Sequence, residues 1–415
     1  MKRDKSNSHY IIFILALYLL PFFIGGCSGG QIVKKDVKVT PWATYLYNKE
    51  RQGNTDDTIL SPLKLARDFR IARGIRFFPI YEPKQYSSPA IVDNVIYIGS
   101  ADKFFYAIDL SKGKRIWEFK TTGAVESSPT VADGMVYFGT NDGKFYCLNG
   151  RDGKEIWRFQ ANTEIISSPI VAKKVIYFNS ADDKLYALNA ETGEKLWQYN
   201  RRYVKGIVKR MFASPTLYND KIYSNFSDGT IVAVEKSSGR EVWTKKIEGK
   251  DEIGFVRATP TVNDGLVYLI NGDGYTVAFD AENGEERWKF DIIRAVNFVL
   301  GQNHIFITGY DGRIVAMKKN SGEIIWRRKV SNGVPASIVI SDNYLIVASN
   351  YESETFFSSI SGSYIDIFEI ETGKRVWDEK IDSTTSTSLP VAYNHLFFVT
   401  DRGFLRIYKS GASSQ

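Results

Sequence analysis

The sequence has 415 residues, of which 24% are charged and 14% aromatic, and its formal net charge at pH 7 is +7. This mild basic excess suits a membrane surface or an acidic partner. It gives no argument for nucleic-acid binding, because lysine and arginine are mostly interleaved with aspartate and glutamate, and we expect no nucleic-acid partner. Only Cys27 and Cys147 are present, so a multi-disulfide scaffold is excluded as well.

The first 26 residues are predicted to be a signal peptide. A basic start with Lys2 and Arg3 precedes an apolar run at residues 10–24, which is short for a membrane span. The run closes on Ile24-Gly25-Gly26-Cys27, which resembles a bacterial lipobox, so we expect Cys27 to be lipidated and to become the new N-terminus. Serine after this cysteine resembles the sorting pattern for the outer membrane. The alternative is an ordinary signal peptide with an incidental cysteine.

Residues 27–68 are expected to hold the lipidated cysteine, a tether and a lead-in segment. The chain is polar and rich in glycine and lysine to about residue 40, which is typical of a flexible tether. Trp42, Tyr45 and Tyr47 follow, and we expect these aromatic side chains to pack against the next domain. A ligand-binding role for them is the alternative.

A unit of about forty residues then repeats along the chain. Its clearest copy begins at Ser127-Ser128-Pro129, alternates through Val136-Tyr137-Phe138-Gly139, turns at Asp142-Gly143 and ends near Trp157. The same signals stand forty residues before and after it. Short strands separated by Asp-Gly turns at this period predict four-stranded propeller blades.

Counting the repeated signals indicates eight blades, one of which lacks its outer strand. The last unit stops near Tyr408 with no tryptophan strand after it, and spacing from Pro89 assigns the missing strand to residues 71–78. We therefore expect an all-β fold, an eight-bladed β-propeller over residues 69–410 closed by an N-terminal strand, with a tail at 411–415. Outer strands are marked by Trp117, Trp157, Trp197, Trp243, Trp288, Trp326 and Trp377, and inner strands begin near Ser87, Ser127, Ser167, Ser214, Thr259, Val296, Ala336 and Ser388.

The repeated residues have structural explanations. Each tryptophan is expected to wedge between blades, and Cys147 takes a place held by alanine in neighbouring repeats, which indicates a small buried residue rather than a reactive thiol. The histidines are too few and too scattered for a zinc site or a catalytic triad. The Asp-Gly and Asp-x-Gly turns are expected to be hairpin turns and not calcium-binding loops. Their aspartates are Asp142, Asp228, Asp273, Asp311 and Asp401.

These motifs resemble PQQ-like propeller repeats, seen in Tyr186-Ala187-Leu188-Asn189 through Gly193 to Trp197. The resemblance covers about 340 residues, and residues 41–63 resemble the lead-in of such propellers. Together with the lipobox, the chain is similar to the BamB family of outer-membrane lipoproteins. The resemblance implies a non-catalytic scaffold without a cofactor, on the periplasmic side of the bacterial outer membrane. It would act as a single propeller within a complex that assembles β-barrel proteins.

Two other functions use the same blade. Quinone-dependent dehydrogenases resemble this chain in fold, but they place a vicinal cysteine pair over the quinone and a Glu, Asn and Asp set around calcium. No such cysteine pair exists here. A ligand- or glycan-binding propeller would use the central funnel, which the Ser-Ser-Pro segments are expected to ring with small hydroxyls; no charge or aromatic cluster marks a site there.

Departures from the repeat give the candidate partner-binding residues. The connector from Trp197 to Pro215 spans 18 residues and that from Trp243 to Pro260 spans 17, where the first repeats have 12. A third insertion at residues 351–364 replaces a tight turn, and all three are expected on one face, where they form either a binding rim or merely solvated loops. The candidates are Arg201, Arg202, Lys205, Lys209, Arg210, Met211, Phe212, Phe255 and Arg257.

The BamB resemblance bears on two of these positions. It implies that an arginine in the first long connector, matched here by Arg210, contacts the barrel-insertase partner. Acidic residues of the family in the next connector are replaced by Phe255 and Arg257. This departure puts the same partner surface in doubt, or implies a partner with different charges.

Overall fold

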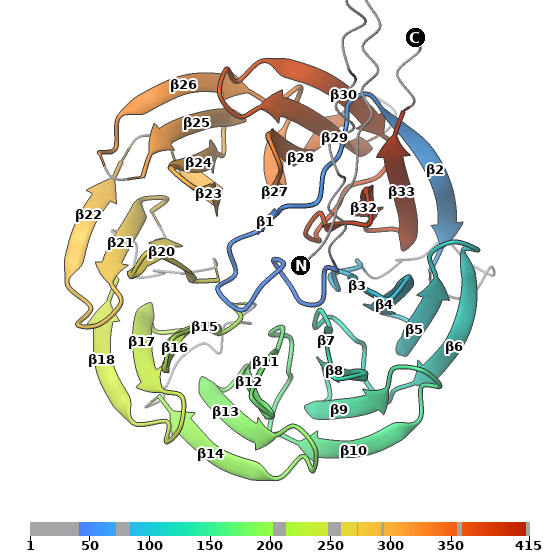
Figure 1. Cartoon of the computed structure of the whole chain (residues 1–415), viewed down its shortest axis with the longest axis vertical. Coiled ribbons are helices and arrows are strands. Elements are labelled where there is room, and N and C mark those ends of the chain that lie inside the picture. Colours follow the sequence, from blue (N-terminus) through green and yellow to red (C-terminus); the bar gives the residue numbers. More distant parts are fainter. Residues whose placement is uncertain are drawn as a thin grey trace, which may run out of the picture. The chain divides into compact units, whose positions relative to one another are not determined.

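The computed structural model describes residues 41–71, 84–201, 213–247, 259–271, 273–291, 294–319, 321–354 and 359–411. The sheets arrange in a closed ring of eight blades (Figure 1). Every regular element in these ranges is a strand, and none of the described residues forms a helix able to cross a membrane. The predicted all-β, eight-bladed propeller is confirmed.

Each blade runs from an inner to an outer strand, and the blades follow the chain around the ring. Blades 1 to 4 comprise β3 (Ala90–Val92), β4 (Val95–Gly99), β5 (Phe104–Asp109) and β6 (Lys114–Lys120); β7 (Thr130–Ala132), β8 (Met135–Gly139), β9 (Lys144–Asn149) and β10 (Glu155–Gln160); β11 (Ile170–Ala172), β12 (Val175–Ser180), β13 (Lys184–Asn189) and β14 (Lys195–Asn200); β15 (Thr216–Tyr218), β16 (Lys221–Asn225), β17 (Thr230–Glu235) and β18 (Glu241–Lys246).

Blades 5 to 8 include two strands from the start of the domain, β1 in blade 7 and β2 in blade 8. They comprise β19 (Thr261–Asn263), β20 (Leu266–Ile270), β21 (Thr276–Asp280) and β22 (Glu286–Phe290); β23 (Ala295–Leu300), β24 (His304–Gly309), β25 (Arg313–Lys318) and β26 (Ile324–Lys329); β27 (Val334–Ser341), β28 (Tyr344–Glu354), β29 (Ser359–Glu369) and β30 (Arg375–Ile381) with β1 (Asn54–Thr55); β31 (Val391–Ala392), β32 (His395–Val399), β33 (Phe404–Ser410) and β2 (Leu63–Arg70).

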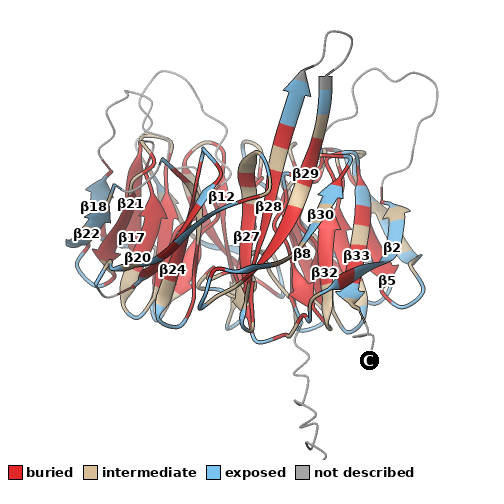
Figure 2. Ribbon diagram, turned by 90° about the horizontal axis from the view of Figure 1, so that it is seen from above, coloured by how far each residue is buried: buried red, intermediate tan, exposed pale blue. Residues whose placement is uncertain are grey.

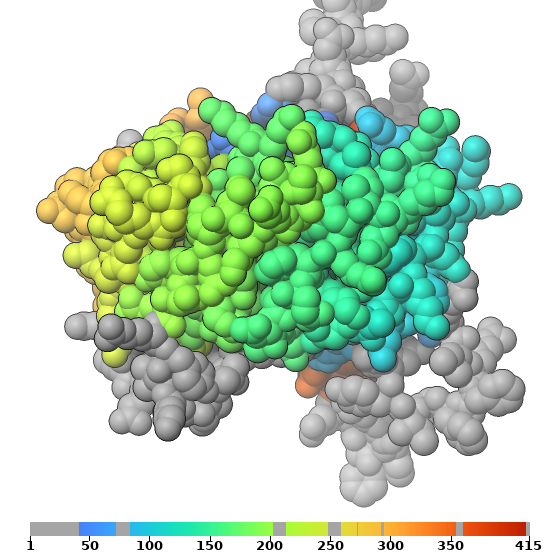
Figure 3. Space-filling model, turned by 90° about the horizontal axis from the view of Figure 1, so that it is seen from below, coloured from blue at the N-terminus to red at the C-terminus, as the bar shows by residue number. Residues whose placement is uncertain are grey.

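The core lies between neighbouring blades. The middle strands are buried on both faces, whereas outer strands such as β6 are mostly exposed (Figure 2). Phe105 stacks on Phe138 of the next blade with ring centroids 4.1 Å apart, and Phe145 stacks on Phe178 at 4.3 Å. Blades adjacent in sequence therefore form a continuous wall, in which the colour runs from cyan through green to yellow (Figure 3).

The repeated tryptophans bind one blade to the next, as predicted. The Trp157 indole N–H donates to the Ala190 carbonyl oxygen at 3.0 Å, and its ring covers Gly193 in the last turn of the following blade. Outer strands continue for about three residues past the tryptophan instead of ending at it. The same inter-blade hydrogen bond is made by Trp117, Trp197, Trp243 and Trp326.

This contact gives a sharp test of packing. A Cβ at Gly193 would lie 2.5 Å from the Trp157 ring, whereas a Cβ at Gly134, which has nearly the same φ of +74° against +73°, would meet nothing within 4 Å. Gly193→Ala should therefore cost about 1–3 kcal/mol more than Gly134→Ala, because only the former adds overpacking to the backbone strain. Equal urea midpoints for the two variants would contradict this account.

The ring closes through β2, which pairs antiparallel with β33 from Leu63↔Ser410 to Arg70↔Phe404. Closure by an N-terminal strand is confirmed, but the assignment of that strand to residues 71–78 is wrong. Ile71 directly follows β2, and residues 72–78 lie outside the described part of the chain. The strand also begins six residues before the propeller boundary expected at residue 69.

The closing strand has Arg67 at the position where the other outer strands have a tryptophan, so counting tryptophans does not reveal it. Arg67 pairs with Ile407, as Trp157 pairs with Cys147, so it occupies the tryptophan position of blade 8. Its guanidinium donates to the Ser111 carbonyl oxygen of blade 1. An arginine thus replaces the indole N–H donor at this junction.

One face of the ring carries the turns between the second and third strands together with the connectors between blades; we call it the connector face. Backbone hydrogen bonds join the two sets: Ala161 N–H donates to the Gly143 carbonyl at 2.8 Å, and Ile247 N–H to the Gly229 carbonyl at 2.9 Å. Asp-Gly turns on this face are hairpins whose glycines have positive φ, including Gly143 and Gly312, as predicted.

Candidate functional site

The lead-in segment, residues 41–62, crosses the central channel and contacts all eight blades. Trp42 is fully buried and exchanges two backbone hydrogen bonds with Ile91 of blade 1, which confirms that its ring packs against the propeller. The segment then follows the inner strands in order to blade 8 (Figure 1). Its further contacts include Ala43 with Val131, Arg51 with Pro169, Lys49 with Leu217, Glu50 with Val262, Asn54 with Leu300, Gly53 with Ile340, and Asp57 with Asn394.

Arg51 fixes this segment from within. Its side chain is 1% exposed, and its five N–H groups donate to five oxygens at 2.6–3.2 Å. Burial lowers the pKa of Arg51 to about 9, which still leaves the guanidinium charged at neutral pH. The acceptors are the Thr44 hydroxyl and the carbonyls of Tyr45, Ser168, Pro169 and Pro215.

The Ser-Ser-Pro segments hold neighbouring blades together. The Ser88 N–H donates to the Ser128 hydroxyl at 2.9 Å, and the Ser388 N–H donates to the Ser88 hydroxyl at 2.8 Å, which completes this contact between the last blade and the first. Ser168 and Ser214 form the same contact at 2.8 Å. The Ser88, Ser128 and Ser214 hydroxyls are buried between blades, whereas Thr259 and Ser388 line a cavity in the channel, so small hydroxyls ring the funnel on only part of its circumference.

The space left in the channel does not resemble a cofactor site. A cavity of about 190 Å³ is lined by uncharged side chains, among them Tyr45, Asn297, Phe298 and Thr387. Among the described residues, no cluster of three or more histidine, cysteine or acidic side chains could hold a metal ion. The described residues of the channel therefore do not fit a quinone held beside calcium.

Cys147 is a packing residue. It is buried opposite Trp157 in the blade 2 sheet, and burial raises the pKa of its thiol to about 12. Since the thiolate is the reactive form, this cysteine is inert in the folded protein.

Of the sequence-derived partner residues, only Arg201 belongs to the described part of the chain. Its Nε lies 3.1 Å from the Asp228 carboxylate, and its backbone N–H donates to the Asp183 carbonyl. This ion pair places the start of the first long connector on the connector face. Arg202, Lys205, Lys209, Arg210, Met211, Phe212, Phe255 and Arg257 lie outside the described residues, as does Cys27.

The third insertion forms an ordered ribbon on the same face. β28 and β29 contain 11 residues each and rise beyond the other strands (Figure 2). Their pairing continues to Glu354↔Ser359, whereas β30 pairs with β29 no further than Ser363↔Ile381. The sequence indicated an insertion here, but it did not reveal that the flanking strands extend through it.

A groove of about 460 Å³ lies beside this ribbon. Ile360 is 51% exposed, and the Lys380 amino group lies 5.3 Å from the centre of the Tyr351 ring. The lining residues are Tyr351, Ile360, Ser361, Lys380, Asp382 and Arg402.

Comparison with known proteins decides the family. The model of the family described as outer membrane protein assembly factor BamB matches residues 80–145, 106–302 and 276–403, which is most of the chain. The chain belongs to the BamB family. It is 26% identical over 117 residues to the BamB proteins of Francisella salina and Francisella tularensis, an alignment that covers 28% of this chain. The chain spans about a fifth of the length of these curated relatives.

Solved structures share the fold of this BamB-family chain. BamB from Moraxella catarrhalis superposes with a TM-score of 0.68 at 17% identity, covering 84% of this chain and 99% of that one. A quinohemoprotein alcohol dehydrogenase from Pseudomonas putida HK5 gives 0.70 at 13% identity, covering 90% and 81%. At such low sequence identities, both similarities show only that the propeller fold is shared.

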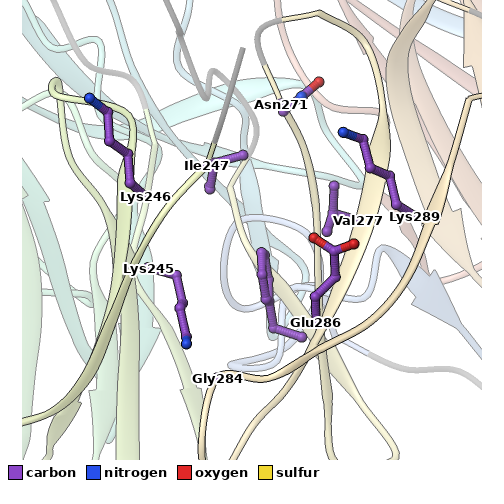
Figure 4. A pocket seen from close by; sticks show the side chains of 9 residues that line it. Lys245, Lys246, Ile247, Asn271, Val277, Gly284, Glu286 and Lys289 are labelled. Carbon is purple, nitrogen blue, oxygen red and sulfur yellow. The ribbon is translucent and has the colours of Figure 1, made fainter.

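A cleft of about 320 Å³ with charged side chains lies between blades 4 and 5 of this BamB-family propeller. Figure 4 shows Lys246 and Lys289 on opposite sides of this cleft, with Glu286 on the same side as Lys289. The Lys245 side chain points away from the other two lysines. Lys289 is engaged with the Tyr275 ring, 4.2 Å from its amino group. Because these groups do not converge on one point, the cleft lacks the geometry of a specific anion site.

Proposed function

We propose that this BamB-family chain is a non-catalytic, lipid-anchored propeller that serves as an interaction scaffold for β-barrel protein assembly on the periplasmic side of the bacterial outer membrane. The observation that carries the proposal is the ribbon of β28 and β29, which extends the connector face where the first long connector also begins. Rigid scaffolds that present extended loops on one face are typical of binding proteins. The channel filled by residues 41–62 and its uncharged cavity favour a scaffold over an enzyme.

The anchor in this proposal is Cys27, joined by a tether to the propeller. Cys27→Ala removes the thiol that accepts the lipid, so the protein is expected in the soluble fraction or as an unprocessed precursor. Membrane fractionation and the mass of the mature N-terminus measure this outcome. A cleaved Cys27→Ala protein that still needs detergent for extraction would refute the anchor.

The partner surface in this proposal includes the first long connector, with its five cations at Arg201, Arg202, Lys205, Lys209 and Arg210. Residues of the second connector, Phe255 and Arg257, and the apolar Met211 and Phe212 complete it. The double variant Arg202→Glu and Arg210→Glu should lose the barrel-insertase partner from crosslinked membranes, because reversing charges at an interface costs roughly 2–5 kcal/mol.

Lys112 and Lys114 provide the control, since they lie in and after the β5–β6 turn on the face opposite the connectors. Reversing both charges there should leave partner recovery unchanged. If the two double variants recover the insertase in equal yield, the first connector is not part of the binding surface.

A further inference from the structure

The ribbon of β28 and β29 has two open backbone edges. Val334↔Asn350 is the last pair between β27 and β28, and Ser363↔Ile381 is the last pair between β29 and β30. Beyond these pairs, residues 351–354 and 359–362 bond to each other and to no further strand within the described chain. Unpaired N–H and C=O groups on an exposed strand are a template for adding another strand.

Side chains alternate across this ribbon, so its two faces differ. Tyr351 opposes Gly362, and Ile360 lies two residues from Gly362 on the same face. A Cβ at Gly362 would lie 2.6 Å from the Tyr351 hydroxyl, so the tyrosine ring fits closely over this glycine. The opposite face carries Glu352 and Ser361. On the first face Tyr351 is 8% exposed and Ser353 is polar, so Ile360 is the large apolar side chain that this face presents to solvent; the second face is polar.

The groove continues from the end of β30 along the open edge of β29. Lys380 lies near the end of β30, and Arg402 extends from the β32–β33 turn of blade 8. Asp382 is the carboxylate of the groove, and it is bound to Arg406 at 2.8 Å. Lys380, whose amino group lies 5.3 Å from the centre of the Tyr351 ring, and Arg402 are both exposed and can meet an acidic group beside Ile360.

We propose that an extended segment of a partner protein adds to the open edge of β29 and lies in this groove. The segment would alternate apolar residues, which meet Ile360 and Tyr351, with polar residues that include a carboxylate between Lys380 and Arg402. Unfolded strands of outer-membrane barrels have such alternation. This inference rests on the proposed scaffold function and specifies what the scaffold holds.

A second copy of this chain fits the groove less well. A two-fold contact between β29 edges would be isologous, so the groove of one copy, with its exposed Lys380 and Arg402, would face the same cationic groove of the other copy. Like charges facing each other across paired strands destabilise the pairing. An acidic strand from a different protein avoids this repulsion.

Fluorescence anisotropy of the full-length protein in detergent tests the proposal. The probe is an end-blocked, labelled heptapeptide in which valine alternates with threonine and one threonine is replaced by glutamate. Ile360→Lys and Arg402→Glu should each weaken its binding by about tenfold or more, since each removes a side chain that faces the bound strand. N-methylation of two consecutive central residues, which removes donors from both edges of the peptide, should abolish binding.

Ile325→Lys and Arg313→Glu are matched controls, because Ile325 is an exposed aliphatic residue on an outer strand and Arg313 follows the corresponding turn of blade 6. Both should bind the probe as the unmodified protein does. No binding of the probe, equal binding of the methylated peptide, or a dimer that Ile360→Lys dissociates would overturn the proposal. If the probe fails while the insertase is still recovered from membranes, only this inference falls; if both fail, the proposed function falls with it.

Discussion

Deletion of residues 41–71 is expected to prevent the propeller from forming a closed, soluble ring. The deletion removes β2, which pairs with β33 along its whole length, and it removes the segment that contacts all eight blades. The edge of β33 would then be exposed, and an open edge on a long strand promotes aggregation. Size-exclusion chromatography and thermal unfolding of the refolded protein measure the result.

Two shorter deletions distinguish the effect of losing β2 from the effect of losing the segment in the channel. Deletion of residues 28–40 should leave the melting temperature unchanged, because the described contacts begin at Trp42. Deletion of residues 28–62 keeps β2 but removes the channel segment, so it should give a closed ring that melts at a lower temperature. A soluble, monomeric product from the 41–71 deletion would show that β2 is dispensable for closure.

The position of the closing strand could not be predicted from spacing, for a physical reason. The blade period was measured between a tryptophan and the next Ser-Ser-Pro, but blade 8 replaces its tryptophan with Arg67. The chain from the end of β2 at Arg70 to Pro89 is also longer than the standard connector. The sequence therefore predicts that closure occurs and how many blades it joins, whereas the register of the last strand depends on tertiary pairing.

The role of the lead-in segment was only partly predictable. Its aromatic residues indicated packing against the propeller, and Trp42 does pack there. Many of its contacts are backbone hydrogen bonds to inner strands of blades far away in sequence, such as the Ile340 N–H with the Gly53 carbonyl oxygen. Every non-proline residue carries the same backbone groups, so such contacts leave no sequence signal. The buried role of Arg51 could not be predicted for the same reason, since four of its five acceptors are main-chain carbonyls.

Replacement of Arg51 by alanine is expected to cost about 3–5 kcal/mol of folding free energy, because it removes a buried, fully bonded charge and leaves its acceptors without donors. The guanidinium joins the lead-in segment to blades 3 and 4 through Pro169 and Pro215.

Arg51→Lys is expected to recover only a small part of this loss, since one ammonium group cannot donate to acceptors spread across a planar fork. The control is Arg158→Ala on the outer strand of blade 2, where the arginine is 60% exposed and its ion pair with Glu155 spans 3.5 Å. That change should alter the free energy of unfolding by about 1 kcal/mol or less. Urea unfolding followed by tryptophan fluorescence compares the three variants. If Arg51→Ala unfolds at the same urea concentration as Arg158→Ala, the segment in the channel is held by its backbone alone, and the buried arginine contributes nothing to it.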